Sequence, residues 1–117
     1  MYALLIYGDD SSWVDLPDDE RARLRALELP EWHALFDELR EADPTYAGKE
    51  LDGRRTAKVV TVRDGERIVT DGPFAETKEL IGGLFLIELP DLDEAIRLAA
   101  RIPAARHGSI EIRPVLQ

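Results

Sequence analysis

Residues 80–89 read Leu-Ile-Gly-Gly-Leu-Phe-Leu-Ile-Glu-Leu, a nearly unbroken apolar run that decides the predicted fold. A short apolar run of this kind predicts a β-strand that is buried on both faces. Residues 2–7, Tyr-Ala-Leu-Leu-Ile-Tyr, have the same character. Residues 110–113 instead alternate apolar and charged side chains before Pro114, as an edge strand does. We therefore expect residues 2–7 and 84–89 in the centre of a sheet and the last strand at its edge.

A long amphipathic helix is predicted after the first strand, from Pro17 to about Glu41. Proline is favoured at the first helical position, and the acidic residues that follow it suit the positive end of the helix dipole. Four apolar side chains follow the i, i+3, i+4, i+7 spacing of a core-facing stripe: Trp32, Leu35, Phe36 and Leu39. Pro30 lacks an amide hydrogen, so we expect a kink there or two consecutive helices.

A β-hairpin is predicted next. Asp64-Gly65 is a two-residue turn signal between the β-prone runs 56–63 and 66–70. The segment before the hairpin, residues 43–54, is polar, and we expect it to form turns.

A second amphipathic helix is predicted after residue 90. Asp91 and Glu94 form a capping box at its start, and Pro103 ends it. With the hairpin taken as one unit, the elements follow the βαββαβ order of ferredoxin-like folds. We therefore predict an α+β, ferredoxin-like βαββαβ fold in which residues 1–117 form a single domain.

The two central strands also predict a homodimer. Two helices can cover only one face of the sheet, which leaves apolar side chains of residues 2–7 and 84–89 on the other face. At roughly 25 cal/mol per Å² of apolar area, exposing several of them to water is costly. The expected remedy is a second copy of the same sheet, packed face to face with the first.

Composition excludes several classes of function. The net charge is −9 and the basic residues do not cluster, so direct nucleic-acid binding is not expected. The chain has no cysteine, which excludes disulfides, iron–sulfur clusters and thiol catalysis. The apolar run at the N-terminus is too short for a signal peptide or a membrane span. We expect a cytoplasmic protein with no membrane association.

The stretch between the hairpin and the next strand, residues 71–79, is the most distinctive motif. It reads Asp-Gly-Pro-Phe-Ala-Glu-Thr-Lys-Glu. Together with Met1-Tyr2-Ala3-Leu4-Leu5-Ile6-Tyr7-Gly8-Asp9, Gly82-Gly83-Leu84-Phe85, Asp91-Leu92-Asp93-Glu94-Ala95 and residues 105–114, it resembles the DGPF group of YCII-related proteins. The resemblance covers nearly the whole chain in the right order.

This resemblance implies a dimeric α/β barrel of the ferredoxin-like type. Proteins of this kind are often encoded beside extracytoplasmic-function sigma factors. A few YCII relatives look like enzymes, one of them a dechlorinase of a hydroxylated aromatic, and a His–Asp pair has been proposed as their catalytic centre.

His33 and Asp71 are the candidate catalytic residues. YCII relatives carry a histidine at the corresponding place in the long helix, and an imidazole suits general acid–base catalysis because it titrates near neutral pH. The alternative is that His33 only flanks the apolar stripe and pairs with Asp37. Asp71 either bonds its own backbone two residues on, as turn aspartates do, or orients His33. Such a pair would abstract a proton from a phenol or enol, whereas acyl transfer lacks a nucleophile.

Phe74, Glu76 and Lys78 are the candidate ligand-binding residues of the same motif. Phe74 is most simply a hydrophobic plug that anchors the loop. Lys78 either belongs to a solvated face or reaches into the cleft between sheet and helices to hold an anionic ligand. No metal-ligand spacing, phosphate loop or dinucleotide fingerprint occurs, so we predict no cofactor.

The sequence leaves two leading functions open, besides stress-related degradation of aromatics, which rests on fold analogy alone. The first is an enzyme or binding protein for a small molecule of unknown identity, with His33 and Asp71 at the centre of the cleft. The second is a non-catalytic regulatory partner, linked to a sigma factor, that uses the dimer surface and the acidic face.

Overall fold

The computed structural model describes residues 1–9, 13, 15–73 and 79–117. Its helices and strands follow the order β1 (Tyr2–Gly8), α2 (Asp18–Ala42), β2 (Ala47–Glu50), β3 (Lys58–Arg63), β4 (Glu66–Asp71), β5 (Leu80–Ile87), α3 (Leu92–Ala100) and β6 (Ser109–Pro114). Short 3-10 turns, η1 (Arg54–Thr56) and η2 (Pro103–Arg106), precede β3 and β6. The predicted α+β class is confirmed. Neither α2 nor any other helix in the described ranges has the apolar length that a bilayer crossing requires.

Four strands form the main sheet in the order β2-β5-β1-β6, and all neighbours are antiparallel. The apolar strands β1 and β5 are central and β6 lies at an edge, as their sequence patterns predicted. The hairpin β3–β4 was predicted to supply a strand to this sheet, and that prediction is wrong, because it forms a separate two-stranded sheet. Its place is taken by β2, in a segment that we expected to form only turns.

The short strand β2 exists because it pairs with β5. Its sequence, Ala-Gly-Lys-Glu, has low intrinsic β propensity, which sheet pairing can override. Gly48 lies opposite Phe85, and a Cβ atom on Gly48 would come within 2.6 Å of the Phe85 ring. The glycine therefore allows this edge strand to approach the core.

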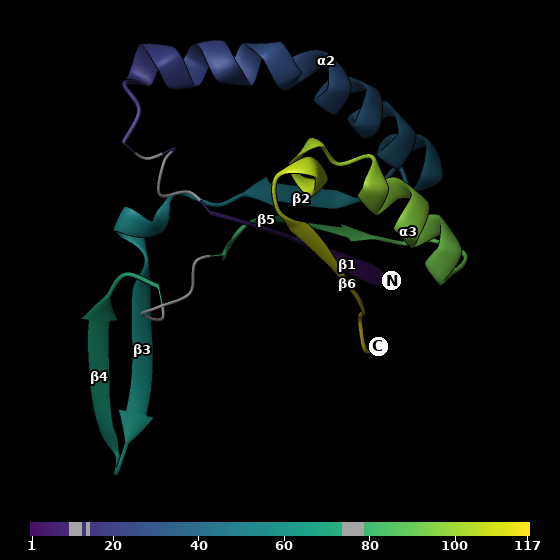
Figure 1. Cartoon of the computed structure of the whole chain (residues 1–117). Helices are drawn as coiled ribbons and strands as arrows, with labels where there is room; N and C mark the ends of the chain where they lie inside the picture. The colour runs from purple at the N-terminus through teal and green to yellow at the C-terminus, as the bar shows by residue number, and fades with distance from the viewer. Residues whose placement is uncertain (10–12, 14, 74–78) are drawn as a thin grey trace.

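Both helices lie on the same face of the main sheet, and the core lies between them and the sheet (Figure 1). The core residues are Leu4, Leu35, Leu39, Phe85, Ile87, Ala95, Leu98 and Ile102. Helix α2 supplies Leu35 and Leu39 from the predicted stripe, while Trp32 and Phe36 are half-buried against the same core. The stripe is therefore confirmed, with its leucines deepest.

Helix boundaries agree with most of the capping signals. Helix α2 is one continuous element with Pro30 inside it, and Pro17 precedes its first residue. Two consecutive helices are thus excluded. At the start of α3, the Asp91 side chain accepts a hydrogen bond of 2.9 Å from the Glu94 amide, which confirms the predicted cap.

The hairpin turn is confirmed at Asp64-Gly65, where both residues have positive φ angles of 53° and 76°. Glycine adopts such angles at no steric cost, and aspartate tolerates them better than most residues. The hairpin projects from the body of the protein, away from the helices (Figure 1). We call residues 58–71 the arm.

The face of the main sheet opposite the helices carries a second apolar surface, here called the helix-free face. Side chains alternate across a strand, so the neighbours of core residues point to this face. Its centre consists of half-buried residues of β1 and β5: Ala3, Leu5, Tyr7, Leu84 and Leu86. The register places Lys49 at one border, and Glu111 and Arg113 at the other. An apolar centre with a charged rim is typical of a protein–protein interface.

Asp43 ties the end of α2 to the end of β5. Its carboxylate accepts hydrogen bonds from the Glu88 amide at 2.9 Å and from the amide and hydroxyl of Thr45 at 2.9 and 2.7 Å. These bonds, first the one from Glu88 and then those from Thr45, hold the pKa of the Asp43 carboxyl below its ordinary value of 3.8. Asp43 is also the buried charged residue of the described chain.

Replacing Asp43 with asparagine should lower the melting temperature by roughly 3–8 °C at pH 7, because an amide nitrogen would then face the Glu88 amide. A carboxyl with a lowered folded-state pKa stabilises the protein above pH 3.8, and this stabilisation is lost as the pH falls through the folded-state pKa. Denaturant unfolding at pH 7, 5 and 3 should therefore show a smaller loss of stability in Asp43→Asn than in the wild type. Asp37→Asn, at an exposed ion pair, is the control. Parallel pH curves for Asp43→Asn and wild type would contradict this role.

Candidate functional site

His33 lies on the exposed side of α2, next to the half-buried Trp32. The sequence predicted this flanking position, because His33 is one residue from the apolar stripe. Within the described residues, the imidazole makes no hydrogen bond or ion pair, so the alternative pairing with Asp37 does not occur. Asp37 pairs instead with Arg40 at 3.2 Å. The ring is thus free to meet a ligand or a second subunit.

Asp71 is the last residue of β4, at the root of the arm, and its side chain is 89% exposed. Its carboxylate pairs with Lys58, which lies directly opposite on β3 and lowers the pKa of Asp71 below its ordinary value of 3.8. The alternative bond to the backbone two residues on is wrong, because Pro73 has no amide hydrogen. A lowered pKa makes Asp71 a weaker base, better suited to orienting a cation than to abstracting a proton.

Among the described residues of one subunit, no ion pair or hydrogen bond connects His33 with Asp71. Helix α2 covers one face of the sheet, whereas the arm that carries Asp71 projects from the other side (Figure 1). The pair therefore stays a prediction, and only an assembled dimer would provide a second Asp71 to meet His33.

Phe74, Glu76 and Lys78 lie outside the described residues, so their predicted ligand contacts stay predictions. The motif is described on both sides of them. Gly72 has a positive φ of 76°, and its amide donates to the Ala57 carbonyl at 2.8 Å. This hydrogen bond closes the root of the arm where the motif begins.

An aromatic ladder runs from the surface of α2 into the core. Trp32 contacts Phe36 with ring centroids 5.8 Å apart, and Phe36 meets the edge of the Phe85 ring at 6.4 Å. Tyr46 contacts Phe85 at 6.2 Å from the other side. Phe85 is buried and the other three rings are half-buried. The outer end of the ladder, at Trp32, is one residue from His33.

The sequence pattern indicates only part of this ladder. Trp32 and Phe36 belong to the predicted helical stripe, but Tyr46 was overlooked in the segment expected to form turns. Phe85 was recognised as part of an apolar strand and not as a link between α2 and Tyr46. Aromatic residues on separate elements give no local signal that they will meet.

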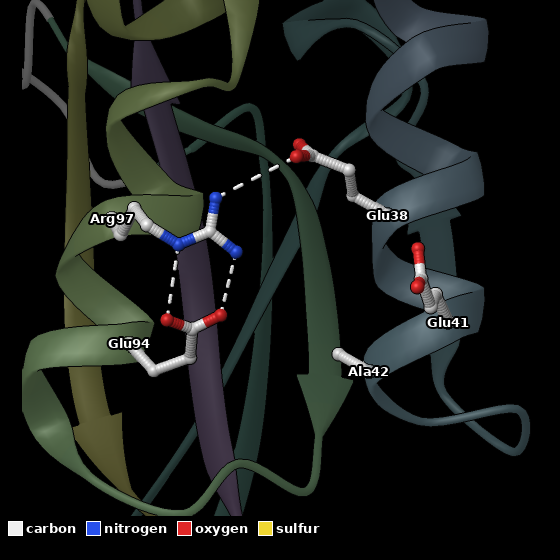
Figure 2. A pocket seen from close by; sticks show the side chains of 5 residues that line it. All are labelled: Glu38, Glu41, Ala42, Glu94 and Arg97. Carbon is white, nitrogen blue, oxygen red and sulfur yellow. Dashed lines mark hydrogen bonds and ion pairs between the residues drawn. The ribbon is translucent and has the colours of Figure 1, made fainter.

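A hollow of about 280 Å³ opens between α2 and α3 (Figure 2). Its lining is charged rather than apolar: Glu38, Glu41, Ala42, Glu94 and Arg97. Arg97 pairs with Glu94 at 2.6 Å and with Glu38 at 3.5 Å, and Arg101 reaches the other Glu38 oxygen at 2.5 Å.

These ion pairs connect α2 with α3 across the hollow, so its charged side chains hold the two helices together. Hydrogen bonding by Glu94 raises the pKa of the Arg97 guanidinium, and Arg97 in turn lowers the pKa of Glu94. Both side chains therefore stay charged and paired at any physiological pH. Ligand sites are mostly lined by apolar side chains with a few convergent polar groups, whereas this hollow is lined mainly by charged side chains. In the described part of the chain, no three His, Cys, Asp or Glu side chains group to hold a metal.

Comparison with known proteins identifies relatives over the full length of the chain. The model of the YCII-related domain matches residues 1–117. The uncharacterized protein R00369 of Rhizobium meliloti (strain 1021) is 35% identical over 117 residues, which cover 98% of this chain and 91% of that protein. The name of this relative gives no activity or ligand.

Proposed function

Because this chain belongs to the YCII-related family, we propose that it acts as a homodimer that binds a small aromatic molecule beside α2. His33 would supply acid–base chemistry to a phenolic or enolic group of that molecule. The aromatic ladder is the observation that carries this proposal.

The ladder suits an aromatic ligand because its outer ring is only half-buried. Trp32 shields one side of Phe36, and its indole N–H donates to Glu28 at 3.4 Å, at the limit of a hydrogen bond. A ligand ring stacked on Trp32 would extend a series of tilted and edge-on contacts that already reaches the core. His33 points about 100° around α2 from Trp32, so a ligand that lies across both side chains would bring a hydroxyl to the imidazole.

One structural feature and one sequence motif support the finer family assignment that we propose. The strand order β2-β5-β1-β6 has the first and third strands of the main sheet in its centre, as a ferredoxin-like fold requires. The stretch Asp71-Gly72-Pro73 with Phe74 supports membership of the DGPF group. Two helix-free faces packed together would complete a dimeric α/β barrel.

A thermal-shift screen against small phenols and aromatic acids tests the function. A ligand at 100 times its dissociation constant stabilises the folded protein by about 2.7 kcal/mol, which is several degrees in melting temperature. Trp32→Leu should abolish most of the shift, since it removes the outer ring. His33→Gln should retain stability without ligand and weaken binding of the phenols by about tenfold.

His107→Gln is the matched control, because it removes the other histidine of the chain, which lies before β6. It should bind the phenols like the wild type. No shift with any phenol, or equal losses in both histidine variants, would count against the proposed site. The non-catalytic regulatory role beside a sigma factor would then become the leading hypothesis.

A further inference from the structure

Apart from Asp71, whose pairing with His33 stays a prediction, the arm takes no part in the site beside α2. Its strands nevertheless carry the most exposed apolar side chains of the two sheets. We propose that one face of the arm, formed by Val60, Val62 and Val69, packs against a second copy of the chain. The inference rests on the proposed homodimer and adds to it a contact surface beyond the helix-free face.

The three valines share one face of the arm. Val60 lies opposite Val69, and Val62 is two residues from Val60 on the same strand. Their exposed fractions are 58%, 60% and 56%. Each is therefore largely open to water although it belongs to a regular strand.

Nothing in the described subunit covers this face. The arm is held at its root by the Gly72–Ala57 hydrogen bond and by ion pairs of the preceding turn η1, from Arg54 to Asp9 at 3.3 Å and from Arg55 to Asp15. A hairpin without further packing is only marginally stable in water. A partner surface over the three open valines would stabilise the arm.

The overall dimensions show how far the arm stands away from the body. The radius of gyration is 16.2 Å, whereas a compact chain of this length has about 13 Å. The arm projects past the helix-free face of the sheet, on the side opposite the helices (Figure 1). A second subunit seated on the helix-free face would therefore lie next to the arm.

The area needed by a stable dimer also favours a second copy as the occupant. The four strands of the main sheet have 7, 4, 8 and 6 residues and lie about 4.8 Å apart, so the sheet face spans about 400 Å². Stable interfaces bury about 800 Å² of accessible surface per partner. One face of the six-residue arm adds about 200 Å². The arm thus supplies a large share of the area that the sheet face lacks.

The charges on the arm are placed as at the rim of an interface. On the valine face, Lys58 and Asp71 form an ion pair at the root, and Arg67 lies near the tip. The valines lie between these charges. An apolar centre between charged ends repeats the arrangement of the helix-free face.

Sedimentation equilibrium of Val69→Glu tests the arm. The substitution should raise the dimer dissociation constant by about tenfold or more, because it places a carboxylate in the centre of the apolar contact between the two copies. Ile68→Glu is the matched control, since Ile68 lies next to Val69 on the opposite face of the same strand. It should leave the dissociation constant within about threefold of the wild type.

The outcomes separate the arm from the dimer itself. If the wild type is a dimer and Val69→Glu has the same dissociation constant, the arm contact is overturned but the dimer is not. Equal weakening by Val69→Glu and Ile68→Glu would overturn the assignment of the valine face. A monomeric wild type would overturn both the homodimer and the arm contact.

Hydrogen exchange gives a second measurement that needs no change in the arm. Amides of residues 58–71 should exchange at least about tenfold more slowly in the wild-type dimer than in Leu84→Glu, a variant of the helix-free face. Equal exchange rates in the two proteins, with the wild type dimeric and the variant monomeric, would overturn the arm contact.

Discussion

Leu84→Glu should convert the proposed homodimer, of about twice 13.2 kDa, into a monomer. Leu84 lies in the centre of the helix-free face, opposite Leu5 on β1. A carboxylate there would be buried between two sheets without a partner, at a cost of several kcal/mol per subunit. Each kcal/mol counts twice in a symmetric dimer, so the dissociation constant should rise by about 100-fold or more. Light scattering at micromolar concentration measures the change.

Ile96→Glu is the control for the Leu84 variant. Ile96 belongs to α3, on the helix side of the sheet, and is 50% exposed. Its substitution also adds one charge to an apolar site and should leave the dimer intact. Circular dichroism should show the same helical content in both variants. A dimeric Leu84→Glu protein would contradict packing through the helix-free face.

Gly108→Ala should be the most destabilising single methyl addition among the described glycines. A Cβ atom on Gly108 would lie 2.0 Å from the Tyr7 carbonyl oxygen and 3.1 Å from the Gly8 Cα. Both are backbone atoms of β1, so relief requires the central strand or β6 to move. Overpacking costs about 1–3 kcal/mol and occasionally more, and a backbone clash belongs at the upper end. The melting temperature should fall by about 10 °C or more.

Gly8→Ala is the control for the Gly108 variant, because a Cβ atom on Gly8 would meet nothing within 4 Å. It adds the same methyl group next to the same contact and should change the melting temperature by less than about 3 °C. If the two variants melt at the same temperature, the close approach of β6 to β1 does not limit stability.

Local pattern predicted most of the elements, because each carries its own signal. The apolar runs, the Asp64-Gly65 turn and the Asp91 cap all lie where the sequence indicates. The ion pair between Lys58 and Asp71 was also predictable. These residues are each six positions from the turn, so the hairpin register places them opposite one another.

The rest depends on contacts between distant segments. Strand β2 has no strand signal of its own and forms only because β5 offers an edge with room for Gly48 beside Phe85. The predicted place of the hairpin was wrong for the same reason, since a clear hairpin pattern does not say which sheet it joins. His33 was correctly expected beside the apolar stripe, but its partner depends on surfaces that the pattern of α2 does not determine.

The central position of β1 also governs how the chain can fold during synthesis. β1 is made long before both of its neighbours, because β5 follows about two-thirds of the way along the 117 residues and β6 comes after β5. Pairings such as Tyr2 with Pro114 close nearly the longest loop that the chain allows, which slows folding. On the ribosome, β1 therefore has no partner strand until β5 has emerged, and its second partner, β6, follows later. Apolar side chains that are exposed during that interval favour aggregation, so the late pairing of β1 makes the nascent chain vulnerable until β5 is made.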